Sequence, residues 1–143
     1  MKKVISLLTL FITLSILSFS CNDDISLDGT VPPIKFTKRV LNLTANAHEE
    51  TIIAKGNKSW GIREYTQIIG NDTTYVIKDA TDEGGWSIIT GDWFRAERKK
   101  EGKELHIKIE ENNTNKARKV VFTFVVSMNG QDFISVKQEA KKE

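Results

Sequence analysis

The chain has 143 residues, of which 39% are hydrophobic and 28% charged, and this size and composition predict one globular domain and exclude a disordered chain. A mean hydropathy of −0.32 excludes a protein with many membrane spans. The 21 basic and 19 acidic residues include Lys2 and Lys3, which are the only charges among residues 1–20, so residues 21–143 carry 19 of each sign. This balance removes the basic excess that nucleic-acid binding requires, and we expect no nucleic-acid partner.

The first twenty residues differ from the rest of the chain. Met1-Lys2-Lys3 is a short positive start, and residues 4–19 are uncharged and almost wholly Val, Ile, Leu, Phe, Ser and Thr. A transmembrane anchor needs about 20 apolar residues, and this run is shorter and contains several hydroxyls. The pattern predicts a secretory signal peptide over residues 1–20.

Cys21 is the only cysteine, so it has no partner for an internal disulfide. A free thiol beside a cleavage site is a poor choice in an oxidising compartment. The segment from Leu17 to Cys21 resembles a bacterial lipobox, in which the cysteine becomes the acylated N-terminus. The resemblance implies a lipid anchor on Cys21 and a tether over residues 21–33.

Period-two alternation dominates the chain after the tether, and β-branched and aromatic residues are common. In residues 104–110, Leu105, Ile107 and Ile109 point one way, and residues 120–126 are apolar on both faces, as in a central strand covered on both sides. Other strands are expected over residues 31–37, 40–44, 51–55, 60–63 and 132–139, with a hairpin over 64–78 that turns at residues 70–72. The pattern predicts an all-β fold, an Ig-like antiparallel β-sandwich of about seven strands plus an inserted hairpin.

The second half of the chain contains a recognisable order of motifs: Trp86-Ser87-Ile88, Asp92-Trp93-Phe94, a strand, Asn112-Asn113-Thr114, Arg118, an apolar strand, and the closing run Ile134-Ser135-Val136-Lys137-Gln138. This order is similar to the BACON domains of Bacteroidetes, and the resemblance covers residues 34–140. It implies an Ig-like sandwich on an exported, lipid-anchored protein and a role in carbohydrate binding. Residues 64–85 look inserted relative to that family.

The resemblance also bears on location. In Bacteroidetes, acids just after the lipidated cysteine resemble the sorting signal for the outer face of the outer membrane, and Asp23 and Asp24 occupy those positions. We expect a lipid-anchored protein of the outer membrane at the cell surface, with the periplasmic face as the alternative. Ordinary polarity of a linker also explains both acids.

Catalytic motifs are absent from the sequence. The two histidines, His48 and His106, lie in no metal-binding or nucleophile-activating pattern, and the paired acids fall on neighbouring positions that face opposite ways in a strand. Asp72, Asp79, Asp82 and Glu83 do not have the spacing of a calcium loop. We expect no enzyme activity, no cofactor and no metal.

Aromatic rings are the candidates for sugar stacking. We expect Trp86 and Trp93 in the core, because they occupy the positions that resemble the family framework. Tyr65 and Tyr75, in the apparent insertion, and Trp60 are the candidate ligand-binding residues. The two tyrosines side by side at the hairpin would favour this role, and otherwise they pair across the hairpin. The alternative is a structural spacer or a domain that pairs with an envelope protein and binds no glycan.

Four further sequence features have local explanations. Asp72-Thr73-Thr74 resembles the O-glycosylation motif of exported Bacteroidetes proteins, which makes Thr73 a candidate acceptor at the hairpin tip. Asn113-Thr114-Asn115 suits a tight loop. Arg118 is expected to bond loop carbonyls, and Gln138 to bond a neighbouring strand.

Overall fold

The computed structural model describes residues 33–126 and 130–142, so Cys21, the signal peptide and all but the last residue of the predicted tether lie outside the described residues. Strands make up most of the described chain, with two short 3-10 helices, η2 (Gly85–Ser87) and η3 (Lys100–Gly102). The strands are β1 (Ile34–Phe36), β2 (Val40–Leu43), β3 (His48–Gly56), β4 (Trp60–Ile69), β5 (Asp72–Ile77), β6 (Ile88–Thr90), β7 (Phe94–Lys99), β8 (Glu104–Ile109), β9 (Arg118–Val126) and β10 (Gly130–Gln138).

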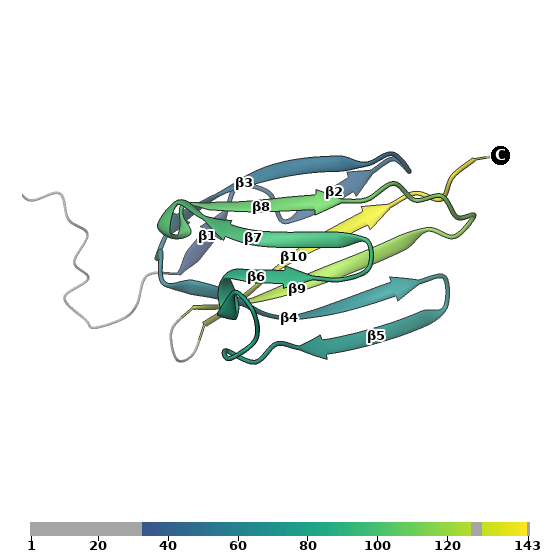
Figure 1. Cartoon of the computed structure of the whole chain (residues 1–143). Coiled ribbons are helices and arrows are strands. Elements are labelled where there is room, and N and C mark those ends of the chain that lie inside the picture. Colours follow the sequence, from purple (N-terminus) through teal and green to yellow (C-terminus); the bar gives the residue numbers. More distant parts are fainter. Residues whose placement is uncertain (1–32, 127–129, 143) are drawn as a thin grey trace, which may run out of the picture. The chain divides into compact units, whose positions relative to one another are not determined.

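The strands form two five-stranded sheets packed face to face (Figure 1). The first sheet has the order β1-β3-β8-β7-β6 and the second has the order β2-β10-β9-β4-β5. These orders contain the A-B-E-D and G-F-C-C′ arrangements of Ig-like sandwiches, with β6 added beside β7. The predicted all-β sandwich is confirmed, with ten strands among the described residues where about seven plus an inserted hairpin were expected. One pairing is not antiparallel as expected, because β2 runs parallel to β10.

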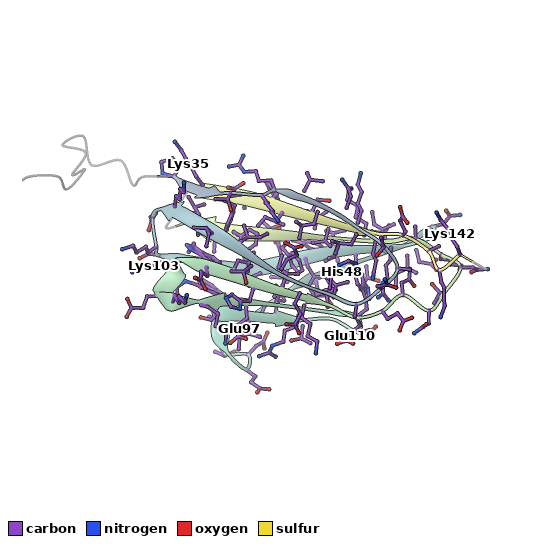
Figure 2. The ribbon with its side chains drawn as sticks, turned by 90° about the horizontal axis from the view of Figure 1, so that it is seen from above. Lys35, His48, Glu97, Lys103, Glu110 and Lys142 are labelled. Carbon is purple, nitrogen blue, oxygen red and sulfur yellow. The ribbon has the colours of Figure 1, made fainter. Side chains whose placement is uncertain are left out.

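The core lies between the sheets and consists of the inward-pointing side chains, which alternate with outward-pointing ones along the strands (Figure 2). Leu105, Ile107 and Ile109 of β8 are buried as the alternation predicts. From the second sheet, Phe122 and Phe124 of β9 face them and are fully buried. Each such side chain contributes about 1.5–3 kcal/mol by leaving water, so these two strands account for much of the stability of the sandwich.

The prediction that β9 is covered on both faces is only half right. Val120, Phe122 and Phe124 face the core, whereas Val121 and Val125 on the opposite side are only partly buried. Strand alternation explains this difference, because the sandwich has two layers and each sheet packs on one face only. The outward side of β9 carries Lys119, Val121, Thr123 and Val125, of which only Thr123 is buried, and no third sheet covers it among the described residues.

Strands β4 and β5 form the predicted hairpin, but the turn is one residue shorter than expected. Ile69 pairs with Asp72, which leaves Gly70 and Asn71 as a two-residue turn, and Gly70 adopts a φ of 59° that glycine tolerates best. Strand β4 also pairs with β9 along its whole length, with a bulge between Ile62 and Glu64. The first arm of the apparent insertion is therefore part of the main sheet, and only β5 is added at its edge.

Two strands of the first sheet were not expected. Strands β6 and β7 pair with each other, and β7 also pairs with β8. In β7, only Phe94 and Ala96 are buried, and the remaining residues are charged. Glu, Lys and Ala are depleted in strands, so this segment depends on its neighbours for its conformation.

Candidate functional site

Trp60 lies in the core, which corrects the expectation that its ring is available to a ligand. The side chain is 5% exposed, and its indole Nε1 donates to the backbone carbonyl of Gly102 over 2.8 Å. The ring packs edge-on against Phe36 and Phe124, with centroids 5.4 and 5.5 Å away. Because the ring already packs against two aromatic side chains and its one N–H already has an acceptor, Trp60 stabilises the core and is not available to a ligand.

Tyr65 is also buried, and it does not lie beside Tyr75. Tyr65 is 8% exposed and packs edge-on against Phe94, and burial raises the pKa of its phenol, with a further contribution from Asp92. Tyr65 pairs with Val76, whereas Tyr75 pairs with Thr66, so the two tyrosines point to opposite faces of the hairpin. The pair of neighbouring tyrosine rings that would have favoured glycan binding at the hairpin does not form.

Tyr75 is exposed as predicted and points away from the core. Its side chain is 55% exposed, and its hydroxyl donates to Glu64 Oε2 over 2.5 Å. This hydrogen bond to a carboxylate raises the pKa of Tyr75 because it stabilises the protonated phenol. Thr73 is exposed on the same side of β5, next to the turn, where an enzyme could reach its hydroxyl.

The two framework tryptophans differ in burial. Trp93 is buried as expected: its Nε1 donates to Gln67 Oε1 over 3.0 Å, and the guanidinium of Arg118 lies 4.4 Å from the ring centroid. Trp86 was expected in the core but is 44% exposed in η2. A Cβ on Gly61 would come within 2.7 Å of Trp86 Cβ, so the backbone of η2 packs closely on β4.

Arg118 and Gln138 have the structural roles that the sequence predicts. Arg118 donates to the backbone carbonyl of Glu110 and, through Nε, to Gln138 Oε1 over 2.8 Å. The amide of Gln138 donates to the carbonyls of Ala45, Asn46 and Glu110. Together they tie β9 and β10 to the loops at one end of the sandwich.

Asn112 is a further structural residue that the sequence reading did not single out. It is fully buried, and its amide donates to the carbonyls of Lys116 and Glu139 over 2.8 Å each. Its Oδ1 accepts from the backbone and hydroxyl of Thr114. The triplet Asn112-Asn113-Thr114 could have predicted this role, because an Asn side chain often hydrogen-bonds the residue two positions later and so closes a turn.

The outward sides of the two sheets differ in chemistry. On the first sheet, Glu97 lies between Arg95 and Lys99, and Glu104 forms ion pairs with Lys100 and His106. The second sheet instead presents large apolar side chains. Among the described residues six such side chains are exposed, and four of them lie on this side: Val40, Tyr75, Ile77 and Phe133.

We call this side of the second sheet the outer face. It spans five strands, which is about 19 Å at the usual strand spacing. Polar groups alternate with the apolar ones on it, including Glu64, Thr66 and Ser135, and the Ser135 hydroxyl oxygen is buried without a hydrogen-bond partner among the described residues. Its members, from β2 to β5, are Val40, Asn42, Gln131, Phe133, Ser135, Lys137, Lys119, Val121, Thr123, Val125, Glu64, Thr66, Ile68, Thr73, Tyr75 and Ile77.

One end of the outer face is hollowed into a groove of about 510 Å³. It crosses four strands at the level where Asn42, Lys137, Lys119 and Ile68 lie side by side. A second hollow of about 310 Å³ lies along the edge strands β5 and β6. In that hollow, Lys78 Nζ donates to the backbone carbonyls of Glu83 and Ile88 and so ties the connecting loop to the strands.

The acids of the connecting loop are occupied within the loop. Asp79 Oδ1 accepts from the backbone and hydroxyl of Thr81, which lowers the pKa of Asp79. Asp82 Oδ2 accepts from the backbone of Asp79 over 2.9 Å. Within residues 33–126 and 130–142, no group of three or more His, Cys, Asp or Glu side chains is placed to hold a metal ion. No helix in the same ranges is long and apolar enough to span a membrane.

Comparison with known proteins supports the fold. No family model matches the chain, and no curated protein is similar to it. The chain is similar to the NMR structure of a protein from Bacteroides thetaiotaomicron, at 20% identity and a TM-score of 0.60, over 87% of this chain and 98% of that one.

Two other solved structures are similar at lower TM-scores. They are a Bacteroides ovatus GH5 xyloglucanase in complex with a XXXG heptasaccharide, at 18% identity and a TM-score of 0.44 over 76% of this chain and 19% of that one, and murine CRIg, at 11% identity and a TM-score of 0.35 over 78% and 98%. The Bacteroides thetaiotaomicron protein therefore shares the fold of this chain, and the fold is what these comparisons establish.

Proposed function

We propose that this protein is a non-catalytic, lipid-anchored envelope protein of the BACON type, and that its outer face binds a glycan chain. The proposed anchor is a lipid on Cys21, which would hold the protein at the outer membrane, on the cell surface or on the periplasmic side. The motif order from Trp86 to Gln138 supports the BACON assignment. The outer face supports the binding role.

The observation that carries the binding role is the gathering of exposed apolar side chains on one sheet face. Val40, Tyr75, Ile77 and Phe133 are each between 49% and 57% exposed, and the outward valines of β9 lie between them. Large exposed apolar side chains that gather on one face, here with single polar residues between them, favour an interaction surface. The first sheet, covered by ion pairs, offers no such surface among its described residues.

The mixed chemistry of the outer face suits a carbohydrate. A sugar has apolar C–H faces that stack on aromatic rings, and hydroxyls that need hydrogen-bond partners when water is removed. Tyr75 and Phe133 supply rings, while Glu64 and Thr66 supply a carboxylate acceptor and a hydroxyl between them. An exposed sheet face of this width suits an extended chain better than a single small molecule, which prefers a concave pocket.

A glycan array with the full-length protein in detergent micelles tests this proposal. We expect retention of the wild type, and loss of at least about tenfold in affinity for Tyr75→Ala and for Phe133→Ala. Tyr75→Phe keeps the ring and removes only the bond to Glu64, so it should retain most of the binding. Ile53→Ala is the matched control, because Ile53 is an exposed apolar side chain of the first sheet. Absence of binding to every glycan on the array would remove the proposal.

A protein-interaction role is the second candidate, and the free edge of β5 favours it. Strand β5 is the last strand of its sheet, and its sequence Asp72–Ile77 contains neither the lysines nor the prolines that usually protect such edges. An edge of this kind can accept a strand from a partner. A photo-reactive residue at Thr74 should then form a protein adduct in intact membranes, and the same residue at Lys55 should not.

A further inference from the structure

Two lysines lie directly opposite each other on the outer face. Lys119 of β9 and Lys137 of β10 are paired in the ladder, so their Cβ atoms are separated by only about 5 Å. Neither lysine forms an ion pair with any residue in the described part of the chain. Like charges directly opposite each other destabilise a sheet. No acidic side chain lies between these two lysines in the strand pairing.

The two lysines line the groove at the end of the outer face. The groove also contains Asn42, Ile68 and Arg118, with Glu139 as its one acid. Arg118 is already engaged with Gln138 and a backbone carbonyl, so the lysines are the cations available to a ligand. The available charge in the groove therefore favours an anion.

The groove continues into the proposed glycan-binding surface. Ser135 and Val121 form the next outward pair along the same two strands, about 7 Å from the lysine pair, and Thr66 and Tyr75 extend that row. A chain that lies across the rings would therefore place one of its substituents between the lysines. Residues 21–143 are balanced in charge, so the lysine pair is a local feature and not part of a general basic surface.

We infer that the glycan is acidic, and that Lys119 and Lys137 bind a carboxylate or sulfate group that it carries. This inference rests on the proposed function and specifies the substrate class for the same face. The two ammonium groups are compact positive charges with three N–H donors each, so they can bind either a carboxylate or a sulfate. Binding should weaken as salt screens the two charges.

Calorimetry with the full-length protein in detergent micelles separates the anion from the sugar backbone. The first matched pair is a six-residue oligogalacturonate and its methyl ester, which has the same backbone without charge. The second pair is dextran sulfate and dextran, and glycerol phosphate serves as a soluble lipid headgroup. We expect an acidic member to bind about tenfold more tightly than its neutral partner at low salt, and glycerol phosphate to bind far more weakly.

The double variant Lys119→Gln, Lys137→Gln should remove this preference while it retains binding to any neutral glycan. Lys55→Gln is the control, since it removes one positive charge from the first sheet. Equal binding of acidic and neutral members, or a preference that survives the double variant, overturns the inference and leaves the proposed function standing. Glycerol phosphate binding as tightly as the acidic glycan also overturns it. Absence of binding to all five probes rejects the acidic class, and an array that retains no glycan rejects the proposed function with it.

Discussion

Replacement of Gln138 by leucine should destabilise the sandwich strongly, although leucine is apolar and similar in size. Gln138 is 1% exposed; its Oε1 accepts from Arg118 Nε, and the two N–H groups of its amide are shared among three carbonyls, those of Ala45, Asn46 and Glu110. In the variant, the Ala45 carbonyl still accepts a hydrogen bond from the backbone N–H of Asn112, and the Glu110 carbonyl still accepts one from Arg118. The variant therefore leaves two groups without a partner, the Asn46 carbonyl and Arg118 Nε.

Asn46 is an exposed residue, so the cost falls mainly on the part-buried Arg118 Nε. An unsatisfied buried group costs about 1–3 kcal/mol, and we expect a loss of about that size in the free energy of unfolding. A domain of this size has about 5–15 kcal/mol in total, so urea unfolding followed by circular dichroism would resolve the change. Gln131→Leu, an exposed position on the same strand, should change stability by less than about 0.5 kcal/mol. A loss below about 1 kcal/mol for Gln138→Leu would refute the role of this network.

Three further predictions concern the tyrosines, the lysine pair and the anchor. Both tyrosines should titrate above pH 10.0 when their ionisation is followed by ultraviolet absorbance. Glu64→Ala should lower the titration midpoint of Tyr75. A Tyr75 midpoint at or below 10.0 in the wild type would contradict its hydrogen bond to Glu64. Because the folded pKa of Tyr75 is raised, the stability from this bond is present below pH 10 and is lost as pH rises through the folded value. Lys119→Thr should raise the free energy of unfolding by about 0.2–1 kcal/mol at low salt, with a smaller gain at high salt, and a loss would count against like-charge repulsion. Cys21→Ala should abolish palmitate labelling, and continued labelling would exclude the anchor.

The position of the hairpin turn decides which residues can form a site, and it was the least predictable feature. A turn over residues 70–72 places Tyr65 and Tyr75 on the same face. The observed two-residue turn at Gly70-Asn71 shifts the pairing by one residue and sends Tyr65 into the core. A one-residue slip always exchanges the two faces of a strand, so the side-by-side tyrosines depended on a detail that composition does not determine.

Strong alternation made some elements predictable and weak propensity concealed others. Strands β8 and β9 follow from the spacing of isoleucine, leucine and phenylalanine. Strand β7, with the sequence Phe-Arg-Ala-Glu-Arg-Lys, becomes a strand because Phe94 and Ala96 pack in the core between β6 and β8. The outer face and its lysine pair required the register between β9 and β10, which the sequence does not specify.

Mapping of a bound glycan by NMR tests the central claim most directly. Titration of the full-length protein with a glycan retained on the array should shift the resonances of Val121, Val125 and Val40, which lie on the outer face among the proposed contacts. Resonances of Thr51 and Lys55, on the outward side of the first sheet, should remain in place. Shifts confined to the first sheet would contradict the account.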